Sequence, residues 1–144
     1  MAYCFCARLA AALDDPGRAA QLHQLLAPYP DQIAVWAVGL GIGCVSYYLG
    51  LLALCMGALD EALERFAAAA TIEQRVGAPT WLARTRVGWA RALLTRRAPG
   101  DAEQAEHLLE QALDDARRLG LAGVERGATA LLGRSRHKGH ELPS

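Results

Sequence analysis

The feature that most constrains the fold of this chain is an internal repeat of 43 residues. Apolar, small and helix-ending positions recur at that single offset. The matched pairs are Ala62 and Ala105, Phe66 and Leu109, Ala69 and Ala112, Val76 and Leu119, Gly77 and Gly120, Trp89 and Leu132, Ala90 and Gly133, and Arg91 and Arg134. A helical unit that recurs at a fixed period is typical of an α-solenoid, in which each unit stacks on its neighbours. The repeat therefore predicts an all-α protein.

Capping and helix-breaking residues set the expected helix boundaries. Asp15 before Pro16 predicts an N-cap with proline at the first helical position, and Gly77 and Gly120 predict helix ends. The expected elements are helical hairpins over about residues 2–27, 44–76 and 79–120 and a terminal helix over 122–136.

These elements predict one helical-repeat domain over residues 1–136, about three hairpins plus the terminal helix, followed by a disordered tail over 137–144. Residues 29–43 follow Pro28, contain Pro30 near the start and include three glycines. They are assigned only to a loop that leads into a helix.

Composition supports this fold class and excludes several partners. The chain has 144 residues, the length of one domain, and its hydrophobic fraction of 53% is carried by Ala and Leu more than by β-branched residues. Fifteen Lys and Arg residues balance fifteen Asp and Glu residues. The chain therefore lacks the excess of cations that direct binding to nucleic acid or to an anionic membrane surface requires.

The uncharged stretch over residues 33–59 supports an alternative, a membrane-associated helical protein anchored by this segment. An apolar run of about eighteen or more residues is a candidate membrane span. Against this alternative, Tyr47 and Tyr48 lie in the middle of the stretch rather than at its ends, and no cluster of Lys or Arg flanks it. We expect a cytoplasmic protein, because the four cysteines do not form the framework of a secreted protein and no cleavable signal sequence precedes them.

No group of residues in the sequence is spaced for catalysis, metal binding or cofactor binding. The four cysteines have neither the pairing of a secreted disulfide framework nor the ligand spacing of a zinc site, so we expect reduced thiols in the core. The glycines of residues 39–43 do not match a phosphate-binding loop. We expect a protein that is not an enzyme and that uses no cofactor or metal.

A short motif resembles the tetratricopeptide repeat. Leu49-Gly50-x-x-Ala53, followed by Ala62-x-x-x-Phe66-x-x-Ala69, has the spacing of that family. The chain departs from the family pattern where Ser46 and Ala53 replace the usual aromatic residues, and where the period is 43 rather than about 34 residues. The resemblance implies a tetratricopeptide-like α-solenoid.

A wider resemblance covers about residues 2–134. The segments LLAPY (25–29), YLGLLA (48–53) and GAPTWLART (77–85) resemble the C-terminal helical-repeat region of large actinobacterial ATP-binding regulators. In that family the region follows an ATPase module. Because this chain has no P-loop and no helix-turn-helix motif, the resemblance implies a scaffold for protein–protein interaction or sensing within a bacterial signalling or transcription regulator.

The resemblance also implies a binding groove, because the first helix of each hairpin lines the concave face of tetratricopeptide-like arrays. On this register the groove residues are Tyr47, Arg84, Arg91 and Arg134. A row of guanidinium groups favours an acidic peptide or the acidic face of a neighbouring domain. Two alternatives remain. The arginines can form a solvated surface and pair with acidic residues of the next helix, or the chain can be a small-ligand sensor whose curved repeat encloses the ligand.

Two expectations concern packing. Gly50 and Ala90 are expected at the closest approach of paired helices. The apolar stripe that includes Ala128, Leu131 and Leu132 is expected to be uncovered, because no partner helix follows it in the sequence. An uncovered solenoid end is adhesive, so we expect either a homo-oligomer or a piece of a longer protein.

Overall fold

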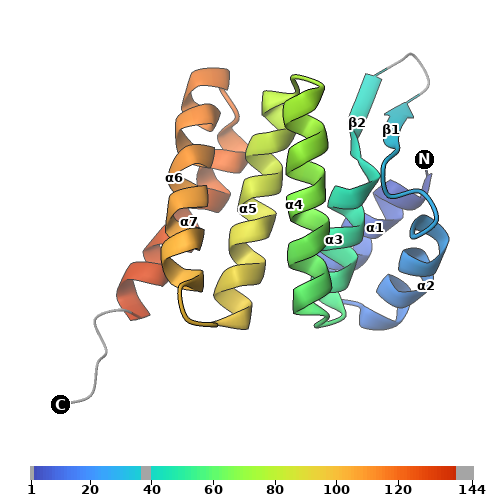
Figure 1. The fold of residues 1–144 in the computed structure, drawn as a ribbon, viewed down its shortest axis with the longest axis horizontal. Helices are drawn as coiled ribbons and strands as arrows, with labels where there is room; N and C mark the ends of the chain where they lie inside the picture. Colours follow the sequence, from blue (N-terminus) through green and yellow to red (C-terminus); the bar gives the residue numbers. More distant parts are fainter. Residues whose placement is uncertain (1, 37–39, 139–144) are drawn as a thin grey trace. The chain divides into compact units, whose positions relative to one another are not determined.

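The computed structural model describes residues 2–36 and 40–138. Within these ranges the chain forms seven α-helices and one two-stranded sheet (Figure 1). The all-α prediction is therefore confirmed, apart from the small sheet. The chain divides into two compact units, Met1–Ala78 and Pro79–Ser144, which are described separately below as the N-terminal and C-terminal units.

The N-terminal unit is built around α3 (Val45–Cys55). The helices that pack against it are α1 (Ala2–Ala12), α2 (Pro16–Leu26) and α4 (Leu59–Arg75). Because three helices surround α3, its first six residues are buried, as are Leu52 and Ala53. The lack of charge in this part of the sequence fits its position in the core.

The turn between α1 and α2 forms as the sequence predicts. Asp15 is the N-cap of α2, and its carboxylate accepts a hydrogen bond of 3.0 Å from the backbone N–H of Arg18. Pro16 occupies the first turn of the helix, where no backbone N–H is needed. Both residues thus favour the start of α2 at this point.

The segment between α2 and α3 differs from the predicted loop. It forms an antiparallel hairpin of β1 (Ile33–Trp36) and β2 (Leu40–Cys44), with a bulge between Ala34 and Val35. The backbone N–H of Val45 donates to the carbonyl of Gln32 (2.8 Å), and the Ser46 hydroxyl donates to the carbonyl of Pro30 (2.7 Å). These bonds tie the start of α3 to the chain that enters the hairpin.

The described residues of the uncharged stretch 33–59 thus belong to β1, β2, α3, the turn after α3 and the first residue of α4. Over residues 2–36 and 40–138, no helix combines the length and the apolar character needed to cross a bilayer.

The α3–α4 pair contains the close approach predicted at Gly50. A Cβ atom built on Gly50 would lie 2.9 Å from two carbons of the Phe66 ring. Phe66 is fully buried, with Ala62 and Ala69 one turn before and after it on the same face of α4. The glycine allows the aromatic ring to lie directly against the backbone of α3.

The C-terminal unit contains α5 (Pro79–Arg96), α6 (Asp101–Leu119) and α7 (Ala122–Lys138). α5 and α6 form a hairpin joined by a short turn, and α7 packs against α6 and also reaches α5 (Figure 1). α6 ends at Gly120 in the left-handed conformation, as predicted. Ala90, the other expected close-approach residue, is fully buried in α5.

Two expectations for the C-terminal end are corrected. Ala128, Leu131 and Leu132 are buried, because α7 turns back onto α6 and α5 and covers its own apolar stripe. The terminal helix extends to Lys138 rather than to residue 136, so the start of the expected disordered tail is helical. The rest of that tail, residues 139–144, lies outside the described residues.

Candidate functional site

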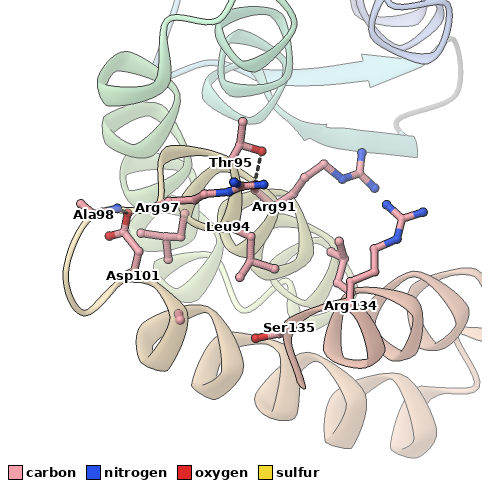
Figure 2. A pocket seen from close by; sticks show the side chains of 11 residues that line it. Arg91, Leu94, Thr95, Arg97, Ala98, Asp101, Arg134 and Ser135 are labelled. Carbon is pink, nitrogen blue, oxygen red and sulfur yellow. Dashed lines mark hydrogen bonds between the residues drawn. The ribbon is translucent and has the colours of Figure 1, made fainter. Parts of the chain in front are cut away.

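A pocket of about 600 Å³ lies within the C-terminal unit (Figure 2). α5 and the turn after it contribute Arg91, Leu93, Leu94, Thr95, Arg97 and Ala98, α6 contributes Asp101 and Ala102, and α7 contributes Leu131, Arg134 and Ser135. The α5 positions 91, 94 and 95 follow helical spacing, as do the α7 positions 131, 134 and 135. One face of each helix therefore forms a wall of the pocket.

Leucine side chains form the apolar part of the pocket. Leu93 and Leu131 are buried at 1% and 8% exposure, and Leu94 is half-buried. Because the first two also belong to the core of the unit, the position of this surface is fixed by helix packing. It offers an apolar group of a ligand a rigid site of contact.

Three arginines add positive charge to the pocket. Arg91, Arg97 and Arg134 are all exposed, and none of them forms an ion pair with another residue of the part of the chain that the structure describes. In Figure 2 the side chains of Arg91 and Arg134, from α5 and α7, extend to the same side of the pocket. Their guanidinium groups are available to an anionic ligand.

Asp101 holds the opposite end of the pocket in place. Its side chain is 4% exposed and accepts hydrogen bonds from Arg96 (2.8 and 3.1 Å) and from the backbone N–H of Ala98 (2.8 Å). The hydrogen bonds from Arg96 lower the pKa of the Asp101 carboxyl, with a further contribution from Ala98. This carboxylate therefore stays ionised and fixes the turn that carries Arg97 into the pocket, where Arg97 adopts a positive φ of 59°.

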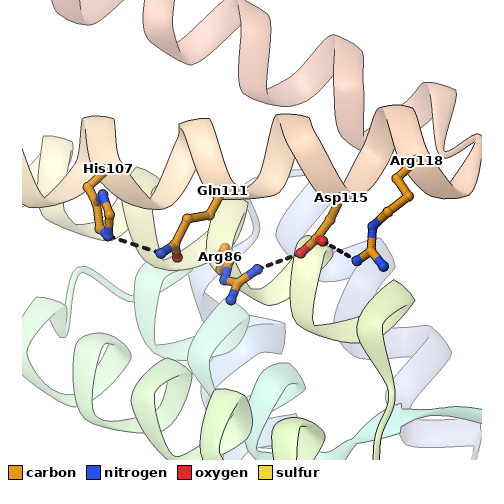
Figure 3. A network of polar contacts seen from close by, with 5 residues as sticks. All are labelled: Arg86, His107, Gln111, Asp115 and Arg118. Carbon is orange, nitrogen blue, oxygen red and sulfur yellow. Dashed lines mark hydrogen bonds and ion pairs between the residues drawn. The ribbon is translucent and has the colours of Figure 1, made fainter.

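A second polar cluster fixes the α5–α6 hairpin (Figure 3). The carboxylate of Asp115 on α6 accepts hydrogen bonds of 2.6 Å from Arg86 on α5 and from Arg118, one turn further along α6. Arg86 and Asp115 are 15% and 17% exposed, so this pair is shielded from solvent. His107 and Gln111 form a separate, exposed contact of 3.0 Å on α6.

The structure separates the predicted groove residues. Arg91 and Arg134 lie together in the pocket, as the 43-residue offset predicts. Arg84 is half-buried and lies two turns before Arg91 on α5, outside the pocket lining. Tyr47 is 6% exposed in the core of the N-terminal unit, with its ring centroid 5.2 Å from that of Tyr48 and 6.0 Å from that of Phe66, so it does not line an exposed groove.

Sequence reasoning missed the other contributors to the pocket. Leu94 could have been found, because it follows Arg91 by three residues and must therefore share its face of α5. Arg97 follows the end of the helix, and its position depends on the contacts that Asp101 makes. No local signal identifies it.

An exposed apolar surface of α1, α2 and the turn between them was also missed. Its members are Leu9, Leu13 and Leu25, which are 49–64% exposed. A shallow pocket of about 280 Å³ lies here, lined in part by Leu9, Leu13, Leu22 and Leu25. α1 buries Cys4, Ala7 and Ala10 against its neighbours, so its large apolar side chains point away from the core.

The cysteines are free thiols of two kinds. Cys4 and Cys44 are buried, and burial raises the pKa of each thiol. Cys6 is exposed and Cys55 is half-buried, so the expectation of core thiols is wrong for Cys6. Within residues 2–36 and 40–138, no group of three or more His, Cys, Asp or Glu side chains is placed to hold a metal ion.

Comparisons with protein-family models, with curated proteins and with solved structures found no significant match to this chain. The arginine pocket is the cavity bounded by Arg91, Arg97 and Arg134 over Leu93, Leu94 and Leu131, and it combines exposed cations with an apolar wall.

Proposed function

We propose that this chain is a non-catalytic helical-repeat scaffold whose arginine pocket binds an acidic segment of a partner protein or of a neighbouring domain. The observation that carries the proposal is the set of three exposed arginines, each without an ion-pair partner among the described residues, around a leucine surface. The resemblance to helical-repeat regions of bacterial regulators supports a place in a cytoplasmic signalling or transcription regulator.

The chemistry of the pocket supports an acidic ligand. Guanidinium groups present paired donors that match the two oxygens of a carboxylate, and they remain charged at any physiological pH. Among the described residues that line the pocket, Asp101 is the one acid. It is already bound by Arg96 and Ala98 and does not neutralise the three arginines. The pocket is therefore complementary in charge to carboxylate groups, whereas the chain as a whole has no net charge.

The proposal is tested with a fluorescent acidic peptide and the double variant Arg91→Ala/Arg134→Ala. We expect the variant to bind at least about ten-fold more weakly, because two charged hydrogen-bonding groups are lost. Binding to the parent should also weaken as salt is added. If the parent and the folded variant bound the peptide with equal affinity, the arginines would be solvated surface residues with no role in binding, and the proposal would be rejected.

A small-ligand sensor is the second candidate, and the pocket volume favours it. A cavity of about 600 Å³ falls within the usual range for small-molecule sites. A set of small organic acids that raises the melting temperature of the parent, but not of the double variant, would support this candidate over a protein partner.

A further inference from the structure

We infer that the segment bound in the arginine pocket is amphipathic: its carboxylates lie at Arg91 and Arg134, and an apolar side chain beside them packs on Leu94 and Leu131. This inference rests on the proposed function and specifies the partner. It identifies the occupant as an acidic segment of a protein chain that carries an aliphatic or aromatic anchor residue.

The anchor follows from the leucine surface. The apolar wall of the pocket continues from the buried Leu93 and Leu131 to the half-buried Leu94. A purely acidic segment would leave this surface hydrated, or would bring carboxylates against it without hydrogen-bond partners. Covering it with one apolar side chain should strengthen binding by about ten-fold or more.

The distance between the leucines and the arginines of the pocket sets the distance between the apolar anchor and the carboxylates of the ligand. Leu94 follows Arg91 by three residues on α5, and Leu131 precedes Arg134 by three residues on α7. Each leucine is therefore roughly 5 Å of helix rise from its arginine. A ligand spans this distance when its anchor lies one helical turn from an acidic residue, or about two residues away in an extended chain.

The exposure of the cations favours a chain segment over a free small molecule. Small-molecule sites usually enclose most of their ligand. Here Arg91, Arg97 and Arg134 are all exposed, so a ligand held by them stays in contact with solvent on one side. A longer segment satisfies this geometry, because only its anchor and adjacent carboxylates need to enter the pocket.

Three labelled peptides of equal length test the inference with the full chain. The first combines Glu with Leu at helical spacing, the second replaces every Leu by Ser, and the third replaces every Glu by Gln. We expect the first to bind at least about ten-fold more tightly than either control, as measured by fluorescence anisotropy.

Protein variants locate the binding. Leu94→Gln should abolish most of the preference for the Leu peptide over the Ser peptide, and Arg91→Ala/Arg134→Ala should weaken both acidic peptides. The matched control is Arg75→Ala/Arg126→Ala, which removes the same charge from exposed positions outside the pocket and should bind like the parent. Circular dichroism confirms that each variant is folded.

The outcomes separate the two claims. Equal binding of the Glu–Leu and Glu–Ser peptides would overturn the amphipathic inference and leave the proposed function standing. Binding of octanoate as tight as that of the Glu–Leu peptide would also overturn it, in favour of a small amphiphile. If neither acidic peptide distinguishes the pocket double variant from its matched control, the proposed function fails together with the inference.

Discussion

The backbone of Gly50 lies directly against the ring of Phe66: a Cβ atom at position 50 would lie 2.9 Å from both Cδ1 and Cε1 of the ring. Non-bonded carbon atoms pack best at about 3.5–4.0 Å. The ring is fully buried, and its centroid lies 6.0 Å from that of Tyr47. Any side chain at position 50 must therefore displace a ring in the centre of the N-terminal unit.

Gly50→Ala is predicted to destabilise the protein by about 1–3 kcal/mol, and Gly50→Leu by more, because both overpack α3 against α4. The measurement is urea unfolding followed by circular dichroism. Gly127→Ala is the matched control, since its new Cβ would meet Val87 Cγ1 at an ordinary 3.6 Å. It should stabilise α7 by up to about 1 kcal/mol. Equal unfolding curves for Gly50→Ala and the parent would contradict the packing of α3 on α4.

Asp101→Asn is predicted to cost about 1–3 kcal/mol at neutral pH, because the amide cannot replace the charge that Arg96 binds. The folded-state pKa of Asp101 is lowered from its ordinary 3.8, so its contribution is complete above that value and is lost as the pH falls toward the folded-state pKa. The difference in unfolding free energy between parent and variant should therefore shrink below about pH 4. If the difference in unfolding free energy stayed constant down to pH 3, the ionised carboxylate of Asp101 would not be the source of the stabilisation.

The two arginines that bind Asp115 are predicted to contribute unequally to the free energy of unfolding. Arg86→Ala should destabilise the α5–α6 hairpin by about 2 kcal/mol, because it removes a shielded, charged hydrogen bond of 2.6 Å. Arg118→Ala should cost less than about 1 kcal/mol, because Arg118 is 66% exposed and its ion pair is screened by water. Thermal unfolding of the two variants side by side tests the order, and the reverse order would contradict it.

The apolar surface of α1 and α2 is predicted to drive self-association. Leu9 and Leu13 are 57% and 64% exposed and lie one turn apart on the same side of the chain. Replacing both with Gln should lower the apparent mass at high protein concentration, as measured by sedimentation velocity. A parent protein that is already monomeric at millimolar concentration would show that this surface does not pair with a second copy.

Local signals predicted the helices, and non-local contacts decided the rest of the fold. Asp15, Pro16 and Gly120 act within one turn of themselves, so their effects could be read from the sequence. The β-hairpin was not predicted, because its strands are short and the two glycines that alternate with apolar residues in β2 weaken the signal for a strand. Its position depends on hydrogen bonds such as the one from Val45 to Gln32.

The candidate site was predicted in part for the same reason. The repeat offset placed Arg91 and Arg134 on one surface, and the pocket contains both. Tyr47 was misplaced because its burial depends on Phe66, which lies on another helix. The covering of Leu131 depends on how α7 turns back onto the α5–α6 hairpin, which no pattern within α7 determines.

The central claim is that the arginine pocket binds acidic chain segments, and the most direct test is a titration of the ¹⁵N-labelled protein with the Glu–Leu peptide, followed by NMR. We predict that the amide signals shifted by the peptide cluster at Arg91, Leu94, Ala98, Leu131 and Arg134. In the Arg91→Ala/Arg134→Ala variant, we predict that the same peptide shifts none of the signals from this pocket. Shifts that cluster instead on α1 and α2, or that persist in the variant, would contradict the account.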